Sequence, residues 1–220
     1  MAATLVPPSF LFRFSLPVRH APRIPGTDDK LLNLSEAHRL PDLGPIEGRT
    51  GFADVRLGWN ERGLGISVEV RGKKKGVIGR QPIPSSADRL RLWIDTRNTQ
   101  NIHRAGKFCH EFHLYPAAGP GPKGDPVAEL RTIDRARESP STANLSLVRT
   151  RMETLSGGYR LEAWFPVEVL TGYSPGEQAK LGFYYHFRDT ELGDQFLSMG
   201  REFPFDYDPS LWQTLELVGA

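Results

Sequence analysis

A tryptophan stands among charged residues in the segment ADRLRLWIDTRN, residues 87–98. Successive side chains of a β-strand point to opposite faces, so one face of this segment is apolar and the other carries Arg89, Arg91, Trp93 and Asp95. An aromatic ring beside charged groups is the chemistry of a sugar site. The C–H groups of a sugar pack on the ring, and its hydroxyls hydrogen-bond to the polar groups.

Three further segments carry rows of the same character. The rows are Cys109, Glu111, His113 and Tyr115; Gly182, Tyr184, His186 and Arg188; and Arg160, Glu162 and Trp164. If the four strands belong to one sheet, these rows meet on one solvent-facing surface. We therefore predict a carbohydrate site with Trp93 and Trp164 as stacking rings. Its other predicted contacts are Arg91, Glu111, His113, Tyr184 and Arg188.

A structural role for the same rows is the alternative. Cross-strand aromatic and opposite-charge pairs stabilise a sheet by roughly 0.2–1 kcal/mol each without any ligand. A loop, such as residues 71–87, could also fold over the rings and form a second small core. Both interpretations of Trp93 and Trp164 remain open at this stage.

The residue types that often carry catalysis are poorly arranged here. Cys109 and His110 are adjacent, so on a strand their side chains diverge, and His113 lies about 13 Å further along. His110 is in phase with apolar neighbours, which predicts a half-buried, hydrogen-bonded histidine. Glu111 and Glu162 could form a glycosidase pair only at a separation of about 5–10 Å, which the sequence leaves open. We expect no catalytic residue.

The sequence contains no recognisable set of residues that would bind a metal or a cofactor. No histidine and cysteine spacing matches a known metal site. Hard oxygen atoms near loops could hold calcium, and the candidates are Asp95, Asn98, Asp206 and Asp208. Met152 and Met199 could serve a haem only as axial ligands, and no haem-attachment motif accompanies them. We expect no cofactor and no metal.

Apolar and polar residues alternate along most of the segments that must position these side chains. This alternation predicts about ten or eleven short strands, with a hairpin turn at residues 60–63 and a single helical turn at residues 167–170. The pattern indicates an all-β fold, a two-sheet antiparallel β-sandwich of the jelly-roll or immunoglobulin-like kind. Strand candidates are 89–95, 108–115, 127–133, 145–151, 159–165, 181–188, 195–199 and 211–218.

One domain over residues 1–220 accommodates this pattern. Residues 1–51 would form an N-terminal strand, with Phe10, Phe12, Phe14 and Leu16 on one side, and an irregular wrap. Residues 52–218 would form the sandwich. Trp59 is in phase with core residues, and Trp212 begins the last strand, so both are predicted to pack internally.

The composition gives no indication of a nucleic-acid or membrane partner. Lys and Arg number 28 against 26 Asp and Glu, a net charge of +2, which favours neither nucleic acid nor an acidic membrane. The basic loop RGKKKG, residues 71–76, is expected to be solvated. No apolar run approaches the roughly 18 residues of a membrane span, and the N-terminus is a poor signal peptide. The chain has one cysteine, Cys109, and we expect a soluble, cytoplasmic protein. The sequence does not determine its oligomeric state.

Six segments in order resemble the family-nine carbohydrate-binding modules and their β-sandwich relatives. They are VRLGWNERGLGISVEV, ADRLRLWIDTRN, FCHEFHLYP, GGYRLEAWFPVEVL, LGFYYHFRD and PSLWQTLELV, spanning residues 52–218. The resemblance implies a non-catalytic sandwich that grips a glycan between aromatic rings. We therefore interpret the chain as a carbohydrate-binding protein. An intracellular protein-interaction or structural sandwich is the alternative, followed by a haem-binding relative or an enzyme.

Overall fold

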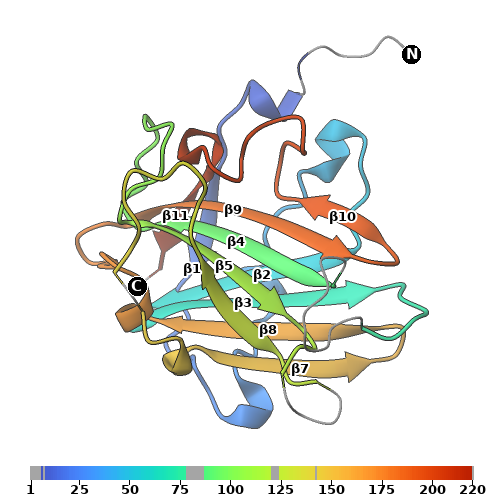
Figure 1. Cartoon of the computed structure of the whole chain (residues 1–220). Helices are drawn as coiled ribbons and strands as arrows, with labels where there is room; N and C mark the ends of the chain where they lie inside the picture. Colours follow the sequence, from blue (N-terminus) through green and yellow to red (C-terminus); the bar gives the residue numbers. More distant parts are fainter. Residues whose placement is uncertain (1–5, 7, 78–86, 120–123, 142, 220) are drawn as a thin grey trace.

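The computed structural model describes residue 6 and residues 8–77, 87–119, 124–141 and 143–219. Within these ranges, eleven strands form one sheet of seven strands and one of four (Figure 1). The predicted all-β sandwich is confirmed. Helix within the described part of the chain is limited to short 3-10 turns, and the turn predicted after Pro166 is one of them, Val167–Val169.

The larger sheet, called sheet A, carries the predicted charged and aromatic rows. Its strand order is β1-β11-β9-β4-β5-β6, and β10 also pairs with β9. All its pairs are antiparallel except β1 with β11, which are parallel. The strands are β1 (Ser15–Arg19), β4 (Arg89–Asp95), β5 (Cys109–Tyr115), β6 (Val127–Arg131), β9 (Lys180–Asp189), β10 (Gly193–Phe196) and β11 (Gln213–Val218).

The smaller sheet, sheet B, has the order β2-β3-β8-β7. Its strands are β2 (Ala53–Asn60), β3 (Gly63–Arg71), β7 (Arg149–Leu155) and β8 (Gly158–Pro166). The predicted turn joins β2 to β3, and Gly63 has φ 154°. A Cβ at Gly63 would lie 2.2 Å from the carbonyl oxygen of Phe165. This turn therefore requires glycine for both backbone angle and space.

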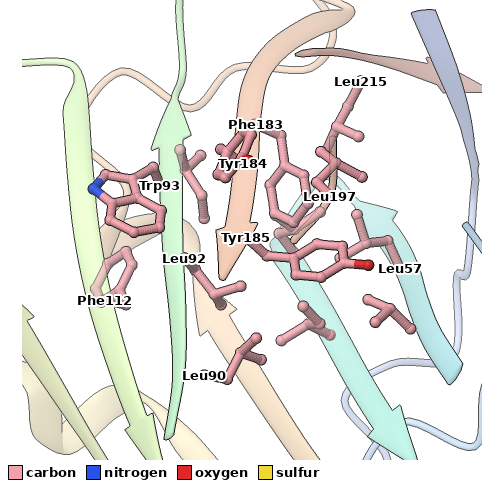
Figure 2. Packing of buried hydrophobic residues seen from close by; sticks show 14 of the residues in the cluster. Leu57, Leu90, Leu92, Trp93, Phe112, Phe183, Tyr184, Tyr185, Leu197 and Leu215 are labelled. Atoms are coloured by element: carbon pink, nitrogen blue, oxygen red, sulfur yellow. The ribbon is translucent and has the colours of Figure 1, made fainter. Parts of the chain in front are cut away.

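Apolar side chains from both sheets meet between them. Phe112 of β5 and Phe165 of β8 have ring centroids 4.5 Å apart, which joins the two layers directly. In Figure 2, Leu92 and Trp93 project to opposite sides of β4, and both belong to one continuous buried cluster. Trp59 is buried as predicted and donates its indole N–H to the carbonyl of Val18 at 2.9 Å.

The outer face of sheet B is covered by the irregular wrap predicted from the N-terminal region. Gly58, Gly65 and Trp164 are neighbours across β2, β3 and β8. The two glycines leave room on the sheet, and a second apolar cluster fills it with Trp164 and residues of the wrap. That cluster is Ala21, Ile24, Leu31, Leu32, Leu34 and Trp164.

Three local predictions are wrong. The expected N-terminal strand begins only at Ser15, and Phe10 and Phe12 before it are 46% and 60% exposed. The strand expected at residues 145–151 begins at Arg149, after a 3-10 turn whose N-cap, Asn144, accepts from a backbone N–H. The basic loop is only partly solvated, because Lys73 is buried. Residues 78–86 of the longer loop, 71–87, lie outside the described residues.

Candidate functional site

Three of the four predicted rows do meet on the outer face of sheet A. Trp93 of β4 is flanked by Glu111 of β5 and by Tyr184 of β9. Arg91 is flanked in the same way by His113 and His186. Alternation within each strand and the order β9-β4-β5 together bring these side chains side by side.

The fourth row lies on the other sheet, so the predicted common surface is wrong. β8, which carries Trp164, pairs with β3 and β7 in sheet B. Trp164 is 3% exposed beneath the wrap. Alternation identifies the face of a strand to which a side chain belongs, but it carries no information on which sheet the strand joins. Trp93 and Trp164 therefore cannot enclose one ligand.

Trp93 is also sealed from solvent, with an exposed fraction of 0%. The segment after β10 crosses the outer face of sheet A and places Phe205 against it. The ring of Phe205 lies 5.5 Å from Trp93 and 4.7 Å from Tyr184. The Tyr184 hydroxyl donates to the carbonyl of Met199 in the same segment. The alternative interpretation of Trp93, a ring covered by a loop, therefore holds, but residues 196–205 form the cover and join the main buried cluster.

Beside this covered region, the three predicted polar residues of β4 and β5 converge. Glu111 Oε1 accepts from Arg91 Nη2 at 2.7 Å and lies 2.7 Å from His113 Nε2. The Arg91 guanidinium lies 4.4 Å from the Trp93 ring centroid. A hollow of about 420 Å³ opens above them, which we call the polar hollow. It is lined by Arg91, Glu111, His113, Arg131, Thr132, Asp134 and Asp206.

Glu111 is the electrostatic centre of the polar hollow. Burial opposes its ionisation, but hydrogen bonds and charge from His113 and Arg91 outweigh burial, so the pKa of Glu111 lies below its ordinary value. Among the described residues its hydrogen bonds all end on Oε1. His113 Nδ1 lies 3.2 Å from the Tyr115 hydroxyl, which fixes its ring.

Sequence reasoning missed four residues of the polar hollow and included four that do not line it, among them Trp93 and Trp164. Arg131 ends β6, and Thr132, Asp134 and Asp206 lie in loops. Loops carry no periodicity that could indicate them, although the sequence offers Asp206 as a candidate calcium ligand. Arg188 sits opposite Arg89 near the strand ends, and Tyr184 is buried under Phe205.

The carboxylates considered for catalysis are far apart in the fold. Glu111 lies on the outer face of sheet A, and Glu162 lies on the outer face of sheet B in the row of Trp164. Two packed sheets separate them, so they cannot act as a glycosidase pair. Burial, followed by the charge of Asp95, raises the pKa of the Cys109 thiol to about 12. Its thiolate is therefore suppressed.

Two of the calcium candidates, Asp95 and Asp208, accept hydrogen bonds from the backbone. The Asp95 carboxylate accepts the backbone N–H of Arg97 at 2.9 Å and of Thr99 at 2.6 Å. Asp208 accepts the backbone N–H of Ser210 at 3.0 Å. Over the ranges that the structure describes, no three His, Cys, Asp or Glu residues are grouped to hold a metal ion. Within the same ranges, no helix is long and apolar enough to cross a membrane.

A comparison with solved structures finds proteins of similar fold. A family-nine carbohydrate-binding module from Caldicellulosiruptor kristjanssonii in complex with cellotriose matches with TM-score 0.63 and 16% identity, over 94% of this chain and 95% of that chain. The same organism's module with glucose matches with TM-score 0.63 and 14% identity, over 94% and 97%. A Bacteroides uniformis protein, provisionally described as carbohydrate-binding, matches with TM-score 0.60 and 13% identity, over 94% and 100%.

Neither a scan of family models nor a search of curated proteins gives a match. At this low identity, the structural likeness shows the fold alone. The chain therefore has a fold like that of family-nine carbohydrate-binding modules, as its ordered segments predicted.

Proposed function

We propose that this protein is a non-catalytic carbohydrate-binding protein and that a sugar binds in the polar hollow. The observation that carries the proposal is the Arg91–Glu111–His113 cluster beneath an open hollow of about 420 Å³. This volume is within the range of small-ligand sites, roughly 300–1,000 Å³. Similarly folded modules have been solved with cellotriose and with glucose, which supports a carbohydrate as the ligand class.

The hollow offers the groups that a polyhydroxylated ligand needs. Arg91 and Arg131 present hydrogen-bond donors, and Glu111, Asp134 and Asp206 present acceptors. Charged groups make stronger hydrogen bonds than neutral ones. Because Glu111 already fixes Arg91 and His113, little side-chain freedom is lost on binding, which favours affinity.

Trp93 acts in this proposal as a positioning residue rather than as a stacking platform. Its ring supports the Arg91 guanidinium at 4.4 Å, and its other contacts are with buried rings such as Phe205. An arginine held against an aromatic face and a carboxylate has one preferred orientation. The buried tryptophan therefore orients the donor that faces the ligand.

Calorimetric titration with glucose and with cellotriose tests the proposal. We expect binding by the full chain and a loss of about tenfold or more in affinity for Glu111→Gln, because a charge-assisted acceptor is removed. Asp206→Asn should also weaken binding. It tests the hollow without removing Glu111 or His113, to which Arg91 donates its hydrogen bonds.

Glu153→Gln is the matched control, because Glu153 lies on β7 of the opposite sheet. Its affinity should equal that of the unmodified protein. The proposal is wrong if neither sugar binds, or if Glu111→Gln and Asp206→Asn bind as well as Glu153→Gln.

A further inference from the structure

A second hollow, of about 470 Å³, lies beside the first on the outer side of sheet A. We call it the aromatic hollow, because Phe10, Phe12, Phe203 and Trp212 contribute to its walls and floor. Asp206 lines the polar hollow, whereas Asp208 lines the aromatic hollow. Two residues of chain span at most about 7 Å, so the two hollows have neighbouring walls.

The ridge between them, residues 204–208, is a tight turn. The Pro204 carbonyl accepts the backbone N–H of Tyr207 at 3.3 Å and of Asp208 at 3.0 Å. The Arg135 guanidinium also lies 4.7 Å from the Tyr207 ring centroid. These contacts fix the ridge, and with it the relative position of the two hollows.

The aromatic hollow has exposed rings and a polar edge. The rings of Phe10 and Phe203 stack at 4.7 Å, and Phe12 is 60% exposed. At the edge, His103 Nδ1 lies 3.0 Å from Asp208 Oδ2 and 3.2 Å from Ser210 Oγ. Apolar ring faces with polar groups at one side suit a molecule that has C–H faces and peripheral hydroxyls.

The N-terminal wall of this hollow is tied down along its length. The Ser9 backbone N–H donates to Glu47 Oε1 at 2.7 Å, and that of Phe14 donates to Gln213 Oε1 at 2.8 Å. Between them, Arg13 donates to Gln100 Oε1 at 2.9 Å. The exposed rings of Phe10 and Phe12 are therefore held on a fixed segment, which is how a preformed binding surface is built.

We infer that the aromatic hollow binds a second sugar ring of the same ligand, so that the preferred ligand is an oligosaccharide that crosses the ridge at residues 204–208. This inference rests on the proposed function, since the first ring occupies the polar hollow. A monosaccharide fills one hollow only. A longer glycan uses both, and its additional affinity comes from stacking on Phe12 and Phe10.

The test compares glucose with cellotriose on the full chain carrying Phe12→Ala. We expect the affinity for cellotriose to fall about five- to tenfold, in keeping with the loss of one ring contact, while the affinity for glucose is unchanged. Leu11→Ala is the matched control. Leu11 is 67% exposed and next to Phe12 but does not line the hollow, so this variant should bind both sugars normally.

The outcomes separate this inference from the proposed function. If Phe12→Ala binds cellotriose normally, or loses both sugars equally, the second subsite is refuted while sugar binding stands. If Leu11→Ala weakens cellotriose as much as Phe12→Ala does, the effect belongs to the segment, and the subsite is again refuted. If the unmodified chain binds neither sugar, both proposals fail.

Discussion

The two ring nitrogens of His110 are bonded in a way that only a neutral imidazole permits. Nε2 accepts the backbone N–H of Thr171 at 3.0 Å, and Nδ1 lies 3.4 Å from the carbonyl oxygen of Ile94. A proton on Nε2 would break the first bond. Burial lowers the pKa of His110 from its ordinary value of 6.5 to about 4. The predicted hydrogen bonding of this histidine is confirmed, but His110 is fully buried and not half-buried.

We therefore predict that acid destabilises the fold through His110. In the unfolded chain the residue takes up a proton near pH 6.5, whereas in the folded chain it does so only near pH 4. The unfolded state binds more protons between these values, so the free energy of unfolding falls as pH is lowered through them. Urea unfolding at about pH 7.5 and about pH 4.5 measures the fall.

In His110→Gln the fall should be smaller by about 2 to 3 kcal/mol, because this variant has no imidazole to titrate. Part of the remaining fall in the free energy of unfolding comes from His186, because burial also lowers the pKa of His186 to about 4. His103→Gln is the control, since the His103 side chain is 78% exposed. An equal fall in the unmodified protein and His110→Gln would contradict the assignment.

At the scale of elements, the paired glycines of β2 and β3 determine what covers sheet B. A Cβ at Gly65 would lie 2.7 Å from Leu32 Cδ2 and 3.2 Å from Ile24 Cδ1. Gly65→Val should therefore displace the wrap from Trp164 and lower the free energy of unfolding by about 1–3 kcal/mol. Urea unfolding measures this loss, and faster tryptic cleavage at Lys30 reports the displaced wrap.

Gly176→Val is the control for this change, because a Cβ at Gly176 meets no atom within 4 Å. Its stability should stay within about 0.5 kcal/mol of the unmodified protein. If Gly65→Val is equally stable and equally resistant to trypsin, the wrap does not depend on the glycine surface.

The sequence predicted the strands well, but it did not predict the segments that cover them. Alternation predicted β4 at Arg89–Asp95 to the residue, and it grouped Arg91, Glu111 and His113 on one face. It could not predict the cover of Trp93, because Phe205 reaches that ring from more than one hundred positions along the chain. Such a contact leaves no local pattern, and neither do the loop residues of the polar hollow.

At the scale of the whole molecule, one buried cation joins the two sheets. Lys73 follows β3 of sheet B, and its Nζ lies 3.1 Å from Asp88 Oδ2 and 2.8 Å from Asp189 Oδ2. Asp88 precedes β4, and Asp189 ends β9, both in sheet A. All three side chains are at most 2% exposed. The sequence predicted a solvated basic loop here, since nothing local indicates these two distant carboxylates.

Removing this ammonium should weaken the whole fold. Lys73→Met would leave two carboxylates buried without their shared cation, and breaking a buried ion pair in this way costs about 3–5 kcal/mol. Lys74→Met is the control, because Lys74 is exposed and bonds Glu191 through its backbone N–H. Urea unfolding at about pH 7.5 compares the two variants, and equal stability would show that the triad does not join the sheets.

The pH dependence of the same triad has the opposite sign to that of His110. Burial lowers the pKa of Lys73, but hydrogen bonds and charge from Asp189 and Asp88 outweigh it, so the pKa lies above its ordinary value. The stabilisation is then fully present below the unfolded-state value of about 10.4 and is lost only as pH rises through the higher folded-state value. Unfolding measured from neutral to alkaline pH should accordingly show a decline above about pH 10.4 that Lys73→Met lacks.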